Sequence, residues 1–198
     1  MVKIVHLVRH GHHPLLAGIL CGRIGGVELD ELGCRQMSVC AGNLFPPPTA
    51  IQSSPQRRAL QSASILAGHF GLAVEIVAAI DELDVGDWTG RSFDDLNKDP
   101  DWHQWNSRRG SNCPPNGESM QCLQRRVVLH LEQLRGDAAD GTIVIVSHAE
   151  PIRAAILHYT NIPLDHFLAV TVDPASVSTL YFDRRGVHVA QINQRAVV

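Results

Sequence analysis

The chain has 198 residues, of which 44% are hydrophobic and 19% are charged. This is the balance of an ordinary globular protein, and the length indicates a single domain. The formal net charge of −3 argues against binding to nucleic acid or to an anionic membrane surface. The 5 cysteines are odd in number and form no C-x-x-C pair, which argues against a disulfide framework and against a structural zinc site.

The sequence also bears on where the protein resides. No N-terminal segment combines the charged, apolar and small-residue regions of a signal peptide. No apolar run approaches the length of a transmembrane helix. The cysteine usage suits a reducing compartment. We therefore expect a cytoplasmic protein that does not bind membranes; the oligomeric state stays open, a homodimer included.

Hydrophobic periodicity predicts strands that alternate with helices along the chain. The predicted strands cover residues 4–8, 50–53, 74–77, 142–146, 177–182 and 187–192. The first predicted helix begins after an N-cap at Asp30 and ends near Leu44. The other predicted helices cover about residues 56–70, 118–134 and 151–159. The last two strands form a hairpin through residues 183–186. This order indicates an α/β fold, a three-layer α/β/α sandwich with a mostly parallel central sheet.

Two segments do not follow this alternation. Residues 11–26, after the first strand, are rich in glycine and histidine and predict a loop. Residues 81–117 have a looser pattern and contain all 3 tryptophans of the chain. Long irregular stretches in a compact domain are usually functional or disordered, and the tryptophans argue against disorder. We interpret 81–117 as a lid-like excursion that contains a small amount of helix, within a single domain that covers residues 1–198.

Charged or titratable side chains follow four of the predicted strands. They are Arg9 and His10, Arg57 and Arg58, Glu82, and His148. Ligands of open α/β sheets bind at the carboxyl ends of the strands, so these side chains could meet at one edge. Guanidinium groups match phosphate oxygens, and a neutral imidazole can act as a nucleophile. Each of these strand-end side chains could also have an ordinary structural role. The histidines could be buried with a satisfied hydrogen bond, the arginines could belong to a solvated basic turn, and the glutamate could be a surface acid.

Five sequence blocks together resemble the histidine phosphatase superfamily, the phosphoglycerate mutase-like proteins, and within it the phosphatase branch. The blocks are Leu7 to Gly11 with the Arg-His-Gly signature, Ser53 to Ala63, Glu82 to Gly90, Gly117-Glu118-Ser119, and Val146 to Ala149. Their order and spacing agree with the family over nearly the whole chain. The resemblance implies a phosphoglycerate mutase-like fold and a small-molecule phosphate ester as substrate.

The resemblance also implies roles for particular residues. His10 would attack phosphorus and become phosphohistidine, and Glu82 would be the proton donor. Arg9, Arg58 and His148 would surround the transferring phosphoryl group. The family's phosphate ligand is the arginine that precedes alanine, which places this role on Arg58 rather than on its neighbour. No metal or other cofactor is expected, because protein cations would neutralise the phosphate.

The chain departs from the family's pattern near the pocket rim. The family usually follows Arg-His-Gly with Glu or Gln and then Thr, where this chain has His12 and His13. Arg23 aligns with the family only when the loop is allowed about one residue of slack. These three residues are candidates for the substrate rim. Arg108 and Arg109, in the lid-like excursion, could meet a second negative group, but we favour a solvated surface pair.

A metal-independent phosphomonoester phosphatase is the function that we expect. A phosphoglycerate mutase with the same pocket is one alternative. The chain lacks the longer insertion after the Glu82 block and the extended tail of the family's bisphosphate-dependent mutases, which favours the phosphatase. A non-catalytic phosphate or phosphoprotein binding protein is a second alternative. A metal-dependent hydrolase is suggested only by His10, His12 and His13, which lack the helical H-E-x-x-H spacing.

Overall fold

The computed structural model describes residues 3–136 and 141–195, and its centre is a six-stranded sheet with the order β3-β2-β4-β1-β5-β6. The strands are β1 (Lys3–Arg9), β2 (Ala50–Ser53), β3 (Val74–Ile76), β4 (Thr142–Ser147), β5 (Val177–Asp183) and β6 (Gly186–Gln194). Strands β1, β2, β3 and β4 pair in parallel. The β5–β6 hairpin adds antiparallel strands beside β1. The predicted mostly parallel sheet is confirmed.

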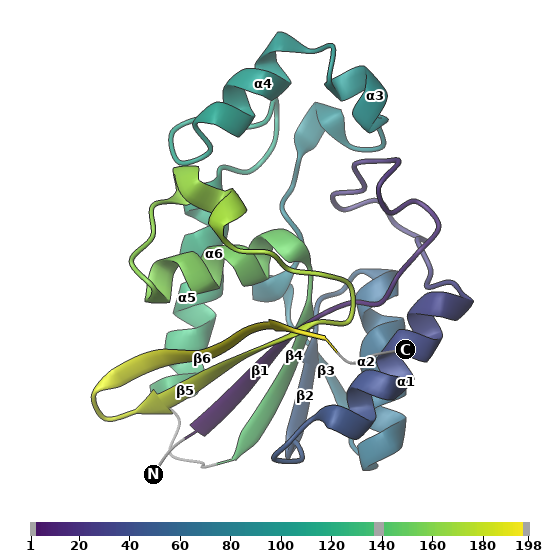
Figure 1. Ribbon diagram of the computed structural model, residues 1–198, viewed down its shortest axis with the longest axis vertical. Coiled ribbons are helices and arrows are strands. Elements are labelled where there is room, and N and C mark those ends of the chain that lie inside the picture. Colours follow the sequence, from purple (N-terminus) through teal and green to yellow (C-terminus); the bar gives the residue numbers. More distant parts are fainter. Residues whose placement is uncertain (1–2, 137–140, 196–198) are drawn as a thin grey trace.

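Helices cover both faces of this sheet, as the sequence predicted (Figure 1). One layer holds α1 (Glu31–Asn43) and α2 (Arg57–Phe70), which pack against each other. The other layer holds α5 (Met120–Gly136) and α6 (Ala149–Tyr159), which also pack together. The three-layer sandwich is thus confirmed.

The two apolar cores follow from the alternation of side chains along the central strands. Val5 of β1 and Ile145 of β4 belong to the core under α5 and α6. Val8 and Val144 belong to the core under α1 and α2. Because both faces of these strands are buried, β1 and β4 consist of nearly continuous apolar residues, as is usual for parallel strands.

The excursion between β3 and α5 contains more helix than the sequence predicted. It forms two 3₁₀ turns, η1 (Ala78–Ile80) and η2 (Gly86–Trp88), and two short helices, α3 (Phe93–Leu96) and α4 (Pro100–Ser107). The side chain of Asp99 accepts a hydrogen bond from the amide of Asp101 and so caps α4, and Pro100 stands in its first turn. These local signals are short, which is why hydrophobic periodicity alone missed them.

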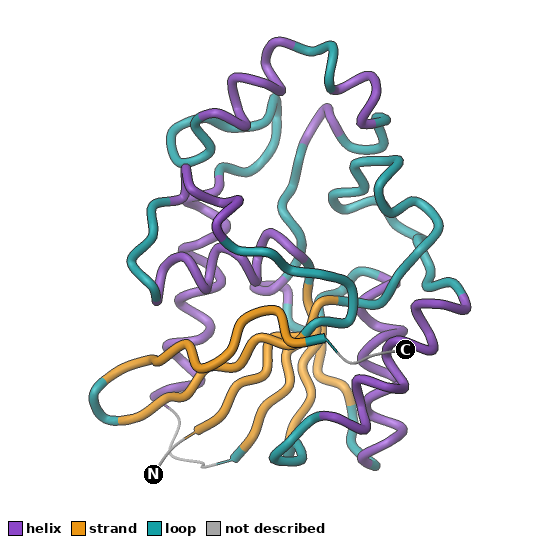
Figure 2. Tube along the Cα trace, viewed as in Figure 1, coloured by secondary structure: helices purple, strands orange, loops and turns teal. Residues whose placement is uncertain are grey.

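Three buried tryptophans hold the excursion together. Trp88, Trp102 and Trp105 have ring centroids 5.3 to 5.5 Å apart. The loop after β1 joins the excursion through a bridge between Ile19 and Ser92. Both segments lie at the end of the molecule where the parallel strands finish (Figure 2). This position is the one expected for a lid, and the assignment as a lid stays a prediction.

The helix boundaries differ slightly from the prediction. Helix α5 begins at Met120 rather than at residue 118, because Ser119 caps it by accepting a hydrogen bond from the amide of Cys122 at 3.1 Å. Helix α6 begins at Ala149, directly after His148. A further 3₁₀ segment, η3 (Leu164–Ala169), follows α6 and was not predicted.

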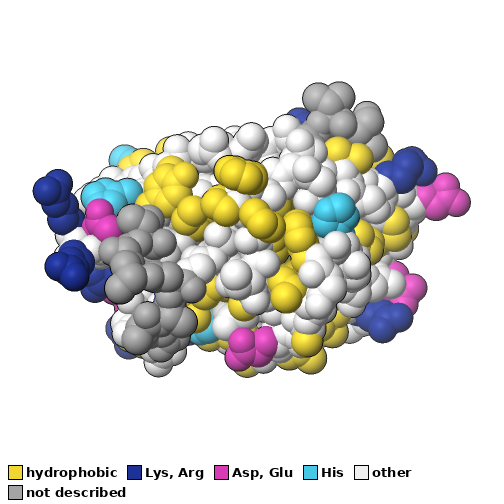
Figure 3. Space-filling view, turned by 90° about the horizontal axis from the view of Figure 1, so that it is seen from below, with side chains coloured by type: hydrophobic (Ala, Val, Ile, Leu, Met, Phe, Trp, Pro, Cys, Tyr) yellow, Lys and Arg dark blue, Asp and Glu magenta, His cyan; other side chains and the backbone are white. Residues whose placement is uncertain are grey.

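The end of the molecule opposite the excursion shows hydrophobic side chains across its middle and Lys and Arg side chains toward its two sides (Figure 3). Among residues 3–136 and 141–195, no helix has both the length and the apolar character needed to cross a bilayer. In the same residues, no three His, Cys, Asp or Glu side chains are grouped so that they could hold a metal ion.

Candidate active site

The predicted strand-end residues meet in one place. Arg9 ends β1, His10 follows it, and Arg58 lies in the first turn of α2. These three and Glu82 line a cavity of about 450 Å³ beneath the excursion. His148 follows β4, the neighbour of β1 in the sheet, and its ring centroid is 5.1 Å from that of His10. The parallel arrangement therefore brings together residues that are far apart in sequence.

His10 is held as a neutral imidazole with a defined tautomer. Its side chain is buried, and Nδ1 lies 2.8 Å from the carbonyl oxygen of Gly11. A carbonyl only accepts, so Nδ1 carries the proton and Nε2 carries the lone pair. Arg58 Nε donates to this Nε2 at 3.3 Å. Burial, followed by the charges of Arg9 and Arg58, lowers the pKa of His10 well below its ordinary value, which keeps the nucleophilic form at neutral pH.

Two glycines allow the backbone to support this arrangement. A Cβ on Gly11 would lie 2.6 Å from the carbonyl oxygen of Gly33 in α1, so no side chain fits there. Gly22 has a φ of +47°, a conformation that favours glycine. In this conformation its carbonyl accepts a hydrogen bond from Arg58 Nη2 at 2.7 Å. Gly22 thus helps to orient the guanidinium group toward His10.

Several buried nitrogen atoms around His10 have no hydrogen-bond partner among the described residues. They are Arg9 Nε, Arg58 Nη1, His13 Nδ1 and His148 Nδ1. Arg9 is fixed by a hydrogen bond from Nη1 to the carbonyl of Val172 at 2.7 Å. Buried polar groups in proteins are rarely left unpaired, and such groups call for an explanation. The two guanidinium donors among them, on Arg9 and Arg58, lie beside a neutral imidazole and suit an anion with several oxygen atoms.

His148 belongs to a chain of hydrogen bonds that the sequence did not reveal. Its Nε2 lies 2.7 Å from Ser54 Oγ, and Ser54 Oγ donates to Asp81 Oδ1 at 3.0 Å. The hydroxyl hydrogen goes to the carboxylate, so Nε2 of His148 carries its own proton. The remaining nitrogen, Nδ1, lies 4.0 Å from Glu82 Oε2. Burial and the charge of Arg58 lower the pKa of His148 well below its ordinary value.

Glu82 is positioned through its backbone. The carbonyl of Glu82 accepts hydrogen bonds from Arg23 Nε at 2.8 Å and from Arg126 Nη2 at 3.0 Å. Its carboxyl group accepts from the amide of Leu83 at 2.8 Å. Burial, assisted by the negative charge of Glu150, raises the pKa of Glu82 to about 7. A carboxyl group with this pKa can both donate and accept a proton near neutral pH.

The three predicted rim residues have different positions. His13 lines the cavity, and its ring centroid is 5.3 Å from that of His10. Burial and the charge of Arg58 lower the pKa of His13 to about 4. His12 does not line the cavity; its Nδ1 pairs with Asp30 Oδ2 at 2.6 Å.

Arg23 does not line the cavity either, because its guanidinium group faces carboxylates. Arg23 Nη2 lies 3.0 Å from Glu118 Oε2, and Nε lies 3.5 Å from Asp81 Oδ2. Its place in the structure is behind Glu82 rather than at the rim.

The expectation that Arg108 and Arg109 form a solvated surface pair is wrong for Arg109. Arg108 is exposed, but Arg109 is buried and lines the cavity. Its guanidinium carbon lies 3.9 Å from the ring centroid of Trp105 and 3.5 Å from that of Phe167. Phe167 comes from η3, far along the chain, so no local pattern could have predicted this burial.

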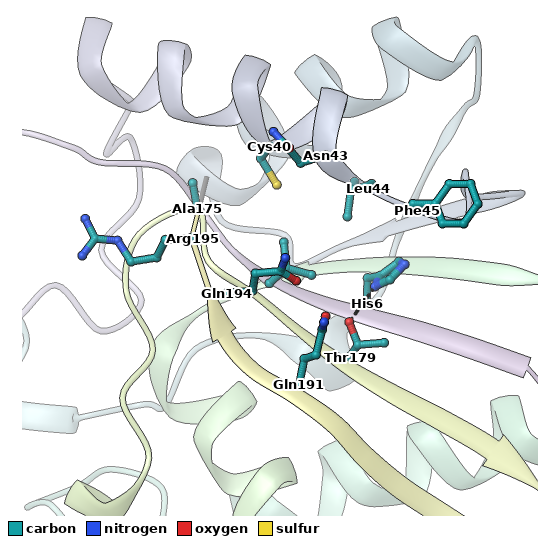
Figure 4. Close-up of a pocket in the computed structure, with 11 residues that line it drawn as sticks. His6, Cys40, Asn43, Leu44, Phe45, Ala175, Thr179, Gln191, Gln194 and Arg195 are labelled. Carbon is teal, nitrogen blue, oxygen red and sulfur yellow. Dashed lines mark hydrogen bonds between the residues drawn. The ribbon is translucent and has the colours of Figure 1, made fainter. Parts of the chain in front are cut away.

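A second, smaller cavity lies between the end of α1 and the β5–β6 hairpin (Figure 4). Its volume is about 60 Å³, far below that of a typical ligand pocket, which is at least roughly 300 Å³. Within it, His6 Nδ1 lies 3.0 Å from Thr179 Oγ1. This cavity has room for a few water molecules, not for a phosphate ester.

The larger cavity places cationic donors and a neutral imidazole at the carboxyl ends of parallel strands, and this defines a candidate phosphate-binding α/β protein. The chain belongs to the histidine phosphatase superfamily (branch 1), whose family model matches residues 5–195. The resemblance noted from the sequence is thereby confirmed.

Individual relatives agree with this assignment. A bifunctional protein of Mycobacterium tuberculosis is 30% identical over 192 residues, which cover 95% of this chain; the chain spans only 53% of that protein's length. Phosphoserine phosphatase 1 of Hydrogenobacter thermophilus is 30% identical over 98% of this chain and 92% of its own. The solved structure of a phosphoserine phosphatase mutant from Entamoeba histolytica, in complex with phosphoserine, is 25% identical with a TM-score of 0.87, over 97% of both chains.

Proposed function

We propose that this chain is a phosphomonoester phosphatase that works through a phosphohistidine intermediate on His10 and needs no metal ion. The observation that carries the proposal is the pair of unpartnered buried guanidinium nitrogen atoms beside His10, Arg9 Nε and Arg58 Nη1. These N–H groups can bind the non-bridging oxygens of a phosphoryl group, and His148 would add a third donor by taking up a proton at Nδ1, which the negative charge of a bound phosphate favours. The family and the phosphatases among its relatives support the same reaction class.

The first chemical step is the transfer of the phosphoryl group to the enzyme. The lone pair on His10 Nε2 attacks phosphorus while the bond from phosphorus to the ester oxygen breaks. The protonated carboxyl group of Glu82, whose pKa is raised to about 7, donates its proton to the departing oxygen, so the alcohol leaves uncharged. Arg9, Arg58 and His148 stabilise the charge of the transferring group, which is the main demand of phosphoryl transfer.

The second step regenerates the enzyme. Glu82, now a carboxylate, accepts a proton from a water molecule while the water oxygen attacks phosphorus. The bond between phosphorus and His10 Nε2 breaks, and inorganic phosphate leaves. The hydrogen bond from Nδ1 of His10 to the Gly11 carbonyl at 2.8 Å keeps the ring oriented through both steps.

The proposal is tested by hydrolysis of p-nitrophenyl phosphate together with trapping of the phosphoenzyme from a labelled ester. The wild-type protein should release inorganic phosphate and carry an acid-labile, base-stable label, and His10→Ala should do neither. His12→Ala is the matched control, because His12 is only two positions from His10 in sequence but does not line the cavity. A folded wild-type protein without turnover would instead indicate a phosphate-binding protein, and loss of turnover in chelator would indicate a metal-dependent hydrolase.

The mutase alternative shares the first step and differs in the fate of the phosphohistidine. In a phosphatase the trapped phosphoenzyme should decay to inorganic phosphate when 3-phosphoglycerate is added. Predominant transfer of the label to phosphoglycerate, with little free phosphate, would replace the phosphatase by the mutase.

A further inference from the structure

The half of the cavity that would hold the leaving group contains a cation that is already paired. Arg109 Nη1 lies 2.9 Å from Glu150 Oε1, an ion pair without the geometry of a hydrogen bond. Its Nη2 donates to Asn106 Oδ1 at 2.7 Å, and its planar face lies between two aromatic rings. Unpaired, such an arginine would suit a substrate carboxylate. In this chain, the carboxylate of Glu150 occupies that place.

Glu150 keeps its negative charge under all ordinary conditions. Burial by itself would raise its pKa, but Arg109 and Arg153 outweigh burial and lower the pKa to about 2. Arg153 Nη1 donates to the same oxygen, Oε1, at 2.7 Å. The other oxygen, Oε2, is buried and has no hydrogen-bond partner among the described residues. Because Glu150 lines the cavity, Oε2 is an acceptor available to a donor group of a ligand.

The remaining walls of this half add no free cation. Asp173 contributes a second carboxylate to the lining. Most other side chains there are apolar: Leu16, Ile19, Leu20, Val85, Phe93 and Trp102. The lining of this half thus has two carboxylates and one arginine, while Arg153, which donates to Glu150, and Arg195, 3.5 Å from Asp173, balance the charge from behind the wall. A ligand would therefore meet the carboxylates of Glu150 and Asp173 at closer range than these two compensating cations. A leaving group with its own carboxylate would face like charges, whereas an apolar body with a hydroxyl or ammonium donor would find complementary groups.

We propose that Glu150 is a specificity-determining residue that excludes phosphate esters with a carboxylate on the leaving group and favours uncharged or cationic, largely apolar alcohols. This inference rests on the proposed phosphatase function. It predicts that discrimination depends on the charge of the leaving group beside Arg109, and not on the phosphate-binding residues.

Matched substrate pairs test the inference directly. O-phosphoethanolamine and O-phosphoserine differ only by a carboxylate, as do phenyl phosphate and 4-carboxyphenyl phosphate. The wild-type kcat/KM should be at least about 100-fold higher for the member without the carboxylate, the size of effect expected when like charges are brought together in an enclosed site. Equal or greater kcat/KM for the carboxylated members would overturn the inference.

Variants then assign the effect to Glu150. In Glu150→Gln the ratio within each pair should fall at least about tenfold, because Arg109 is released for the substrate carboxylate. Both substrates of a pair are compared in the same variant. Any effect of the substitution on the nearby Glu82 therefore changes both kcat/KM values alike and cancels in their ratio. In the double variant Arg109→Met/Glu150→Gln, the released arginine is absent, so the carboxylated substrates should lose the kcat/KM that they gain in Glu150→Gln. A ratio that Glu150→Gln leaves unchanged would refute the assignment.

Two further results keep the test decisive. Should Glu150→Gln fail to fold, as judged by thermal melting, Glu150→Ser provides the answer. It also removes the carboxylate, so the ratio within each pair should again fall at least about tenfold, and an unchanged ratio would refute the assignment. Absence of turnover on every ester, phenyl phosphate included, would refute the proposed phosphatase function; turnover with a preference for carboxylates would refute only this inference.

Discussion

Replacing Arg58 by alanine should nearly abolish turnover, and the adjacent Arg57 provides a control. Arg58 is buried, its Nε lies 3.3 Å from His10 Nε2, and its Nη1 has no partner among the described residues. Arg57 is exposed, and its Nε pairs with Glu28 Oε1 at 3.0 Å. The two arginines are neighbours in sequence and have the same charge. A difference between their variants therefore reports position and not net charge.

The magnitude follows from what the guanidinium group does in the proposed reaction. An arginine that stabilises a transferring phosphoryl group contributes roughly 10³- to 10⁵-fold in rate, or about 4–7 kcal/mol of barrier. The loss in Arg58→Ala should lie in this range for kcat/KM. Stability should change less, because loss of the hydrogen bond to the Gly22 carbonyl is offset by removal of a buried charge. In Arg57→Ala only an exposed ion pair is lost, which is worth about 0–1 kcal/mol.

The assay is kcat/KM for p-nitrophenyl phosphate, with the inhibition constant for inorganic phosphate and the melting temperature measured on the same preparations. Arg58→Ala should lose both turnover and phosphate inhibition, and Arg57→Ala should keep both within about twofold. A folded Arg58→Ala protein with turnover within tenfold of wild type would refute the reasoning. An equal loss in the Arg57 variant would show that the wrong arginine, or the wrong cavity, has been assigned.

Three further predictions concern the groups around the transferring phosphoryl. Glu82→Gln should slow hydrolysis of alkyl phosphates far more than that of p-nitrophenyl phosphate, whose leaving group departs without a proton; equal losses would make Glu82 structural. Because the pKa of Glu82 is raised to about 7 and its protonated form is needed first, wild-type kcat/KM for alkyl phosphates should fall about tenfold per pH unit above that value; a fall of the same steepness in Glu82→Gln would assign it to another group. Ser54→Ala should lower kcat by up to about 100-fold because the ring of His148 loses its orienting partner, and a normal kcat would show that the ring is held without Ser54.

The sequence predicted the architecture because hydrophobic periodicity responds directly to burial. The continuous apolar runs of β1 and β4 are buried on both faces, and the helices that cover them show one apolar face each. The prediction failed mainly in short segments. Helices α3 and α4 have 4 and 8 residues, which is too few turns for a clear period, and they are defined by caps and by tryptophan packing.

The sequence by itself also indicated which strand ends should carry the phosphate chemistry, and the family resemblance favoured Arg58 over Arg57. The parallel sheet then brings Arg9, His10 and Glu82 to one cavity, because the carboxyl ends of parallel strands share an edge. The roles of these side chains in catalysis stay predictions until the variants are measured.

Only the tertiary structure decided the surroundings of these side chains. Ser54 and Asp81 form their hydrogen-bond chain with His148 across 94 and 27 positions of sequence separation. Arg109 is buried by Phe167 from a distant segment, and Glu150 neutralises it. Local sequence shows which residues can be charged, but desolvation and pairing depend on neighbours that the folded chain brings together. For that reason the sequence could name the groups that we propose bind phosphate, but not the groups that we propose select the alcohol.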